Sequence, residues 1–198
     1  EIVLDKPTYI GACVTEYAKL HMYRILYDQL PLMFPEGVEL VYTDTDSFIV
    51  RVTHPEGWTS TQLFDHIKSI VPNFLGSKGG QLKSETGEDL IDEVIALRSK
   101  VYAYRTKDGH IGKRAKGTTA AAQATQLDWE KYKEALIDLR AIPTHNSQFV
   151  RSKFGIKTTD LLKVSLSAND GKRRVEPDGI HTRAFGFYKN DNPLLPHQ

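Results

Sequence analysis

The chain has 198 residues, 40% of them hydrophobic, which is enough for one domain of ordinary size or one domain with a small appendage. Its formal net charge of +1 excludes a uniformly basic DNA clamp, and its single cysteine, Cys13, excludes a disulfide framework. No apolar run approaches the roughly 20 residues of a membrane span, and no signal peptide is recognisable. We therefore expect a soluble intracellular protein of the nucleus or cytoplasm, with no membrane partner.

A long helix is predicted near the start of the chain. Residues 8–30 carry apolar side chains at helical spacing on two faces, with Pro7 near the start and Pro31 at the end. A helix with two apolar faces buries most of its surface. We therefore expect this helix to be largely buried, and Cys13 to be a small core residue within it.

A β-hairpin and a second helix are predicted next. Residues 38–52 contain two short runs rich in β-branched residues on either side of a polar turn, which is typical of a hairpin. The loop His54–Gly57 ends this hairpin. Thr59 or Ser60 is then placed to cap a short helix that runs to about Val71.

A second hairpin follows in the middle of the chain. Residues 95–106 alternate in part and are rich in Val and Tyr, which favours a strand. This strand is expected to pair with residues 111–115, because the connection between them contains the hairpin signal Asp108-Gly109. Asp128 is then expected to cap a helix from Trp129 to about Leu139.

The C-terminal third predicts short strands at residues 149–154, 161–166 and 184–188. Asn169-Asp170-Gly171 predicts a turn, and the tail at residues 190–198 is expected to be loose. The pattern as a whole predicts an α+β fold.

Charge is unevenly spread along the chain. Residues 98–116 contain seven cationic side chains and one acid, Asp108, whereas residues 85–93 contain five acids and no base. Near-neutral charge with a local basic stripe suits a protein that grips a polyanion on one face. The alternative for either run is a solvated surface.

Two carboxylates stand at the tip of the first predicted hairpin, Asp44 and Asp46. Carboxylates with one residue between them at such a turn can converge on a divalent cation, and Mg²⁺ prefers these hard oxygen ligands together with substrate phosphates. A bare Asp-x-Asp is weak evidence, because it also occurs in transferases that hold a nucleotide sugar through a metal.

The longer string Tyr42-Thr43-Asp44-Thr45-Asp46-Ser47 resembles the YxDTDS signature in the palm of family B DNA polymerases. Other segments, in the family's order, resemble elements of its protein-primed viral and mobile-element (Polinton-like) members. They are Lys6–Gly11 with the helix after it, the KxY element in Leu97–Tyr102, Lys116-Gly117 after the second hairpin, and Ser165–Asp170 with Asp178–Thr182 near the end.

The resemblance implies an architecture. Residues 1–125 would form the C-terminal half of a polymerase palm, an antiparallel sheet with packed helices. Residues 126–198 would form a small β-rich thumb and the C-terminal tail. The implied activity of the parent enzyme is template-directed transfer of deoxynucleotides by a two-metal-ion mechanism.

The resemblance also implies roles for single residues. Asp46 would be the principal ligand of two Mg²⁺ ions, with Mn²⁺ as an alternative, and Asp44 would assist directly or through water. Tyr42 and Thr43 would sit near the primer end. Lys100 and Tyr102, two apart on the predicted strand, would share a face that touches the primer. Further candidates for contacts to the DNA backbone are Arg98, Arg105, Lys113, Arg114 and Lys116.

Parts of the family pattern have no match in the chain. A DxxSLYP motif with a further carboxylate and a KxxxNSxYG fingers motif are both missing, and the first residue is Glu1 rather than Met. We therefore interpret the chain as part of a polymerase that is inactive when isolated. Its expected partners are primer-template DNA, the remainder of the polymerase, deoxynucleoside triphosphates in the complete enzyme, and a terminal-protein primer.

Two alternatives remain open. The chain could be a non-enzymatic module derived from a polymerase that binds DNA or a partner protein. It could also be a nucleotide-sugar transferase that uses the Asp-x-Asp pair, although that interpretation leaves Lys100-Val101-Tyr102 and the C-terminal matches without an explanation.

Overall fold

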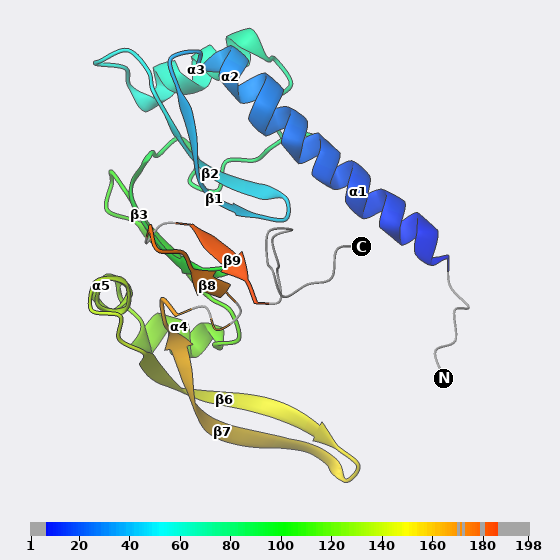
Figure 1. The fold of residues 1–198 in the computed structure, drawn as a ribbon, viewed down its shortest axis with the longest axis vertical. Helices are drawn as coiled ribbons and strands as arrows, with labels where there is room; N and C mark the ends of the chain where they lie inside the picture. The colour runs from blue at the N-terminus through cyan, green and yellow to red at the C-terminus, as the bar shows by residue number, and fades with distance from the viewer. Residues whose placement is uncertain (1–6, 170, 172, 179–180, 186–198) are drawn as a thin grey trace. The chain divides into compact units, whose positions relative to one another are not determined.

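The computed structural model describes residues 7–169, 171, 173–178 and 181–185. These residues form two compact units. The first contains the described residues of Glu1–Val94 and Tyr104–Ile111, and the second contains those of Ile95–Ala103 and Gly112–Gln198. Helices and small antiparallel sheets occur together, which confirms the predicted α+β class (Figure 1). Residue 125, the predicted boundary between palm and thumb, falls inside the second unit.

The first helical segment is longer than predicted and contains a π-helical turn. α1 (Thr8–Arg24) continues into η1 (Ile25–Gln29) and α2 (Leu30–Met33), so that Pro31 lies inside the last turn rather than after it. A proline within a helix lacks a backbone N–H and crowds the carbonyl four residues earlier. A π-helical turn directly precedes this proline, and both features are places where a helix departs from regular α geometry.

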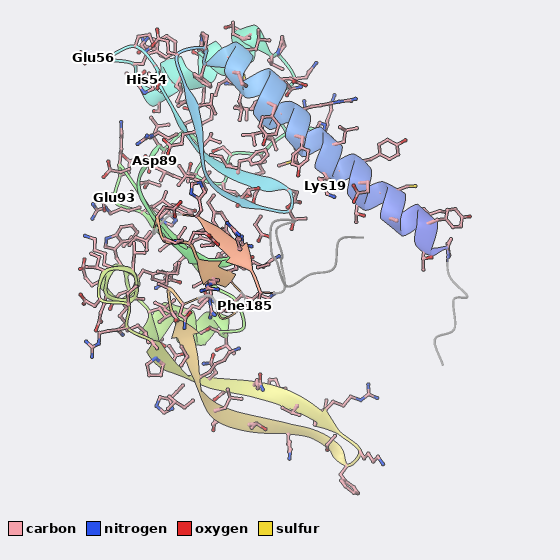
Figure 2. The ribbon with its side chains drawn as sticks, viewed as in Figure 1. Lys19, His54, Glu56, Asp89, Glu93 and Phe185 are labelled. Atoms are coloured by element: carbon pink, nitrogen blue, oxygen red, sulfur yellow. The ribbon has the colours of Figure 1, made fainter. Side chains whose placement is uncertain are left out.

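The prediction that this helix is buried is wrong. In α1 only Met22 is buried, and Cys13 is exposed. Figure 2 shows side chains projecting outward along α1, with Lys19 labelled among them. Both apolar stripes exist in the sequence, but among the described residues only the C-terminal end of the segment, with Ile25, Leu30 and Met33, packs into a core.

The first hairpin forms as predicted and packs on the core of the first unit. β1 (Val38–Asp44) and β2 (Ser47–Val52) pair antiparallel, and α3 (Ser60–Ile70) follows. Thr59 caps α3: its hydroxyl accepts from the N–H of Gln62, and its own N–H donates to the Gln62 side chain. These two bonds satisfy donors that a helix start leaves unpaired.

The second predicted strand is divided by a turn. β3 (Ile91–Arg98), β4 (Val101–Thr106) and β5 (Ile111–Ala115) form one sheet in that order. Ser99 and Lys100 are the connection between β3 and β4, and Lys100 has a φ of 62°. The prediction of one continuous strand over residues 95–106 is therefore wrong, because the chain reverses at this left-handed residue.

The core of the second unit lies between strands and two helices. α4 (Ala120–Gln126), which was not predicted from the sequence, is capped by Thr119, and α5 (Trp129–Ile137) is capped by Asp128 as predicted. The core gathers the apolar residues Ile95, Leu97, Val101, Ala103, Ala115, Leu127, Trp129, Tyr132, Ala135 and Leu166.

A long two-stranded ribbon belongs to the second unit. β6 (Ile142–Ser152) and β7 (Gly155–Leu166) pair antiparallel over nearly their whole length (Figure 1). The predicted strands at 149–154 and 161–166 were thus too short, and the first of them ran into the turn at Lys153-Phe154.

A shorter hairpin, β8 (Arg173–Val175) with β9 (Thr182–Ala184), ends the described chain. The prediction of a strand at 184–188 is met at Ala184 and is wrong at Phe185, which lies in a turn, while residues 186–188 lie outside the described residues. Asp170 of the predicted turn and the tail at 190–198 also lie outside them. None of the helices within the described ranges has the length and apolarity to cross a membrane.

Candidate active site

A β-bulge in the first hairpin decides which way the carboxylates face. Leu40 lies opposite Val50, but Tyr42 lies opposite Ile49, so Val41 is an extra residue in β1. Residues directly opposite each other in an antiparallel pair share a face. Without the bulge, Tyr42 and Asp44 would continue the face of Val38 and Leu40; with it, they move to the other one.

The two faces of this hairpin have different surroundings. Val38, Phe48, Val50 and Val52 share one face and pack against the core of the first unit. Asp44, opposite Ser47, therefore belongs to the face directed away from that core. Bulges occur often beside active sites because they re-aim a side chain in this way.

Hydrogen bonds hold the turn that carries both carboxylates. The N–H of Asp46 donates to the carbonyl of Asp44 at 2.6 Å, and Thr45 between them has a φ of 55°. The Ser47 hydroxyl donates to the same carbonyl at 3.1 Å. The backbone of the turn is thus fixed by its own polar groups, which places both carboxylates on one short segment.

The Asp44 carboxylate is itself oriented. It is half-buried, and its Oδ1 accepts a hydrogen bond from the Thr45 hydroxyl at 3.1 Å. Asp46 is exposed, and within the described ranges it forms no ion pair. One carboxylate is therefore positioned by a neighbour, while the other is presented to solvent.

These two residues fit part of a Mg²⁺ site. They offer hard carboxylate oxygens, of which Mg²⁺ needs one or two when phosphates and water complete its shell. No group of three or more His, Cys, Asp or Glu placed to hold a metal occurs in the part of the chain that the structure describes. The pair alone is a partial ligand set, and a site built on it needs further oxygen ligands.

Lys100 occupies a special backbone position in the second unit. Its φ of 62° is uncommon for a residue other than glycine, and its carbonyl accepts the N–H of Lys116 at 3.0 Å. Both lysines are exposed. The prediction that Lys100 and Tyr102 share a strand face is wrong in its premise, because Lys100 lies in the turn before β4. The sheet nevertheless brings Lys100 and Lys116 to one corner.

Three other predicted DNA contacts have partners inside the chain. The Lys113 ammonium donates to the carbonyl of Leu127, and the Arg114 guanidinium donates to the carbonyl of Lys113 at 3.3 Å. Arg105 lies 2.7 Å from the carboxylate of Glu93, which is labelled in Figure 2. Such contacts compete with phosphate for the same donors, so these three cations are less available to DNA than their charge alone indicates.

Lys163 on β7 was not among the site residues predicted from the sequence. Its ammonium donates to the carbonyl of Gly117 at 2.9 Å, directly after Lys116. Gly117 has a φ of 81°, and a Cβ there would lie only 2.4 Å from the Lys163 nitrogen. Lys163 lies two residues before the buried Ser165, so both side chains lie on the same face of β7.

The structure groups the predicted site residues by unit. Tyr42, Thr43, Asp44 and Asp46 lie together on the first hairpin, where the Thr43 hydroxyl donates to the carbonyl of Ser47 at 3.1 Å. Arg105 also belongs to this unit. The second unit holds Arg98, Lys100, Tyr102, Lys113, Arg114 and Lys116.

Comparison with curated proteins gives one informative match. A protein of Podospora anserina named "Probable DNA polymerase" is 26% identical to this chain over an alignment 194 positions long, which covers 94% of the chain. The chain is similar to a DNA polymerase. It spans 13% of the length of that relative. No family model matches the chain, and no solved structure matches it.

Proposed function

We propose that this chain is part of a DNA-directed DNA polymerase and carries two of its metal-binding carboxylates, Asp44 and Asp46. The observation that carries the proposal is the hairpin itself, whose bulge and hydrogen-bonded turn direct a carboxylate pair away from the core. The similarity to a polymerase along 94% of the chain supports it. The partial ligand set is what a fragment of a larger site would contain.

The different surroundings of Asp44 and Asp46 indicate different roles in metal binding. Asp46, exposed at the turn, is the principal metal ligand, and Asp44 assists directly or through water. The Thr45 hydroxyl fixes the rotamer of Asp44, as hydrogen-bonding neighbours of metal ligands generally do. When bound, Mg²⁺ supplies Lewis-acid stabilisation to the attacking 3′-hydroxyl and the leaving pyrophosphate.

The remaining residues bind DNA in this proposal. Tyr42 lies on the same face of β1 as Asp44 and is proposed to contact the primer end, with Thr43 beside it. Lys100 and Lys116 neutralise backbone phosphates as point charges and position the strand without reading its sequence. Tyr102 packs on a sugar or base of the primer strand.

The finer assignment rests on the resemblance of motifs. We propose a family B enzyme of the protein-primed type found in viruses and mobile elements, with a terminal protein as primer and deoxynucleoside triphosphates as substrates. We further propose that the 198 residues do not polymerise alone, because two carboxylates make only part of the two-metal site.

Primer extension with Mg²⁺ on a primed template tests this proposal. The purified chain is assayed alone and again when joined to the upstream part of the polymerase. Extension in the joined protein and none with the chain alone is the expected result. Extension by the isolated chain would show that its own residues complete the site and would refute the fragment proposal.

A second candidate is a DNA-binding module without catalysis, favoured by the exposed lysine corner of Lys100 and Lys116. In that case the joined protein also fails to extend a primer, while DNA binding persists.

For either candidate, Lys100→Ala should weaken DNA binding about fivefold, or about 1 kcal/mol for one charge-assisted contact. Asp46→Asn should leave affinity unchanged or slightly higher, because it removes a negative charge near phosphate. An unchanged affinity for Lys100→Ala would remove Lys100 from the DNA contact.

A further inference from the structure

Lys116 stands in a short turn that follows β5. Its N–H donates to the carbonyl of Lys100 at 3.0 Å. The N–H of Thr118 donates back to the carbonyl of Ala115, also at 3.0 Å. Gly117 between them has a φ of 81°, in the left-handed region that favours glycine. The backbone around the exposed Lys116 therefore follows one defined path.

The strand β7 contacts this turn at two successive residues. The Lys163 ammonium donates to the carbonyl of Gly117 at 2.9 Å. The Ser165 hydroxyl accepts from the Thr118 hydroxyl at 2.6 Å and lies 2.5 Å from the hydroxyl of Thr144. The last three side chains form a buried network, and such networks make structure rigid when their members are bonded. The turn is therefore fastened to β7 at residues 117 and 118.

Lys163 and Gly117 are packed against each other. A Cβ at position 117 would lie 2.4 Å from the Lys163 nitrogen and 3.5 Å from its Cε atom. An exposed lysine usually keeps its ammonium in water, but this ammonium is directed onto a backbone carbonyl. A hydrogen bond with a charged donor is stronger than one between neutral groups. The close fit indicates that Lys163 holds the turn in place.

We propose that Lys163 is a positioning residue for Lys116, holding the turn so that the Lys116 ammonium meets a phosphate of bound DNA. This inference rests on the proposed function, which gives Lys116 a contact to the DNA backbone. Ordering a mobile turn on binding costs entropy, and a turn that is already ordered avoids this loss. Lys163 thus raises DNA affinity through Lys116.

A phosphate contact by Lys163 itself is the alternative, and the two roles differ in their coupling to Lys116. The loss of a positioning residue has little effect once Lys116 has been removed. An independent contact keeps its full effect in that background, because contributions of separate contacts add. A double-mutant cycle therefore distinguishes the two roles.

Fluorescence anisotropy of a labelled primer–template duplex, titrated with the 198-residue chain at several salt concentrations, measures this cycle. The proteins compared are the unmodified chain, Lys163→Met, Lys116→Ala and the double variant. The matched control is Lys78→Met, alone and together with Lys116→Ala, because it removes the same charge from an exposed lysine of the first unit. Circular dichroism verifies that each variant remains folded.

Lys163→Met should weaken DNA binding about threefold, less than the roughly fivefold loss expected for Lys116→Ala. In the Lys116→Ala background, Lys163→Met should add no further loss. The slope of log affinity against log salt should fall by about 1 in Lys116→Ala and by no more in the double variant. Lys78→Met should bind DNA nearly as the unmodified chain does.

Amide hydrogen exchange measured by NMR reads the position of the turn without DNA. The N–H groups of Lys116 and Thr118 should exchange about three- to tenfold faster in Lys163→Met than in the unmodified chain. Gly117→Ala should have the same effect, because its Cβ displaces the Lys163 ammonium. Exchange at both amides should stay unchanged in Lys78→Met.

Two results would overturn the inference about Lys163. One is an additive loss of affinity in the double variant with a salt slope lower by about 2, which would make Lys163 a phosphate contact of its own. The other is unchanged amide exchange in Lys163→Met. Failure of the proposed DNA contact gives a different pattern: Lys116→Ala binds DNA as tightly as the unmodified chain, while amide exchange still responds to Lys163→Met. The inference would then fall together with that contact.

Discussion

Tyr132 links α5 to the strand that carries Lys113 and Arg114. Its side chain is fully buried, and its hydroxyl donates to the carbonyl of Arg114 at 3.0 Å. Burial raises the pKa of this tyrosine above its ordinary value, because the charged form would lie away from water. The pKa shift therefore predicts a pH dependence for the stability of the second unit.

The direction of the change in stability with pH follows from the protonation of Tyr132 in the folded and the unfolded chain. In the unfolded chain Tyr132 ionises with the ordinary pKa of about 10, whereas the folded side chain stays protonated. Its contribution is fully present below pH 10 and is lost as the pH rises above that value. At pH 11 the unfolded state has gained about 1.4 kcal/mol from this one proton.

The variant Tyr132→Phe isolates this effect. At pH 8 it should lose about 1 kcal/mol, the usual net value of one hydrogen bond. At pH 11 the unmodified chain has lost stability because Tyr132 ionises only in its unfolded state, whereas Tyr132→Phe has no such group to ionise. The difference in stability between the two proteins should therefore fall to about zero. Urea unfolding followed by the fluorescence of the neighbouring buried Trp129 measures both values.

A matched control is Tyr17→Phe on α1, because Tyr17 is 72% exposed and its hydroxyl meets water in both states. This variant should lose stability at high pH as the unmodified chain does. The same alkaline loss of stability in Tyr132→Phe and in the unmodified chain would refute this prediction, because the buried tyrosine would then contribute nothing to that loss.

Two further predictions concern caps and buried polar groups. Thr59→Ala removes the N-cap of α3 and should cost about 1 kcal/mol, measured by urea unfolding with Trp58 fluorescence; a change below a few tenths would show that the capping box is dispensable. Ser165→Ala leaves the buried hydroxyls of Thr118 and Thr144 without their shared partner and should cost about 1–3 kcal/mol. An unchanged unfolding midpoint would contradict the role given to this network.

Local signals in the sequence predicted much of the fold. The hairpin at residues 38–52 and the caps Thr59 and Asp128 follow from patterns a few residues long, and the structure confirms them. Burial of α1 could not be predicted, because an apolar stripe shows that a helix can be covered and not what covers it. The turn at Lys100 was also hidden, because a left-handed non-glycine residue carries little sequence signal.

The candidate site shows the same limit. The sequence identified Asp44 and Asp46, but alternation alone would have put Asp44 on the core face of the hairpin. The extra residue, Val41, changes that phase, and nothing in its identity indicates a bulge. Partners such as Glu93 for Arg105 depend on strand pairing, so a list of cations could not separate engaged side chains from exposed ones.

The central claim, that Asp44 and Asp46 are metal ligands of a polymerase, is tested most directly by primer extension with Mg²⁺ in the chain joined to the upstream part of the proposed parent polymerase. Asp46→Asn and Asp44→Asn are compared with Asp65→Asn, an exposed acid on α3 of the same unit. We predict that Asp46→Asn abolishes primer extension, that Asp44→Asn strongly reduces it, and that Asp65→Asn leaves it unchanged. Full extension by Asp46→Asn would contradict the claim.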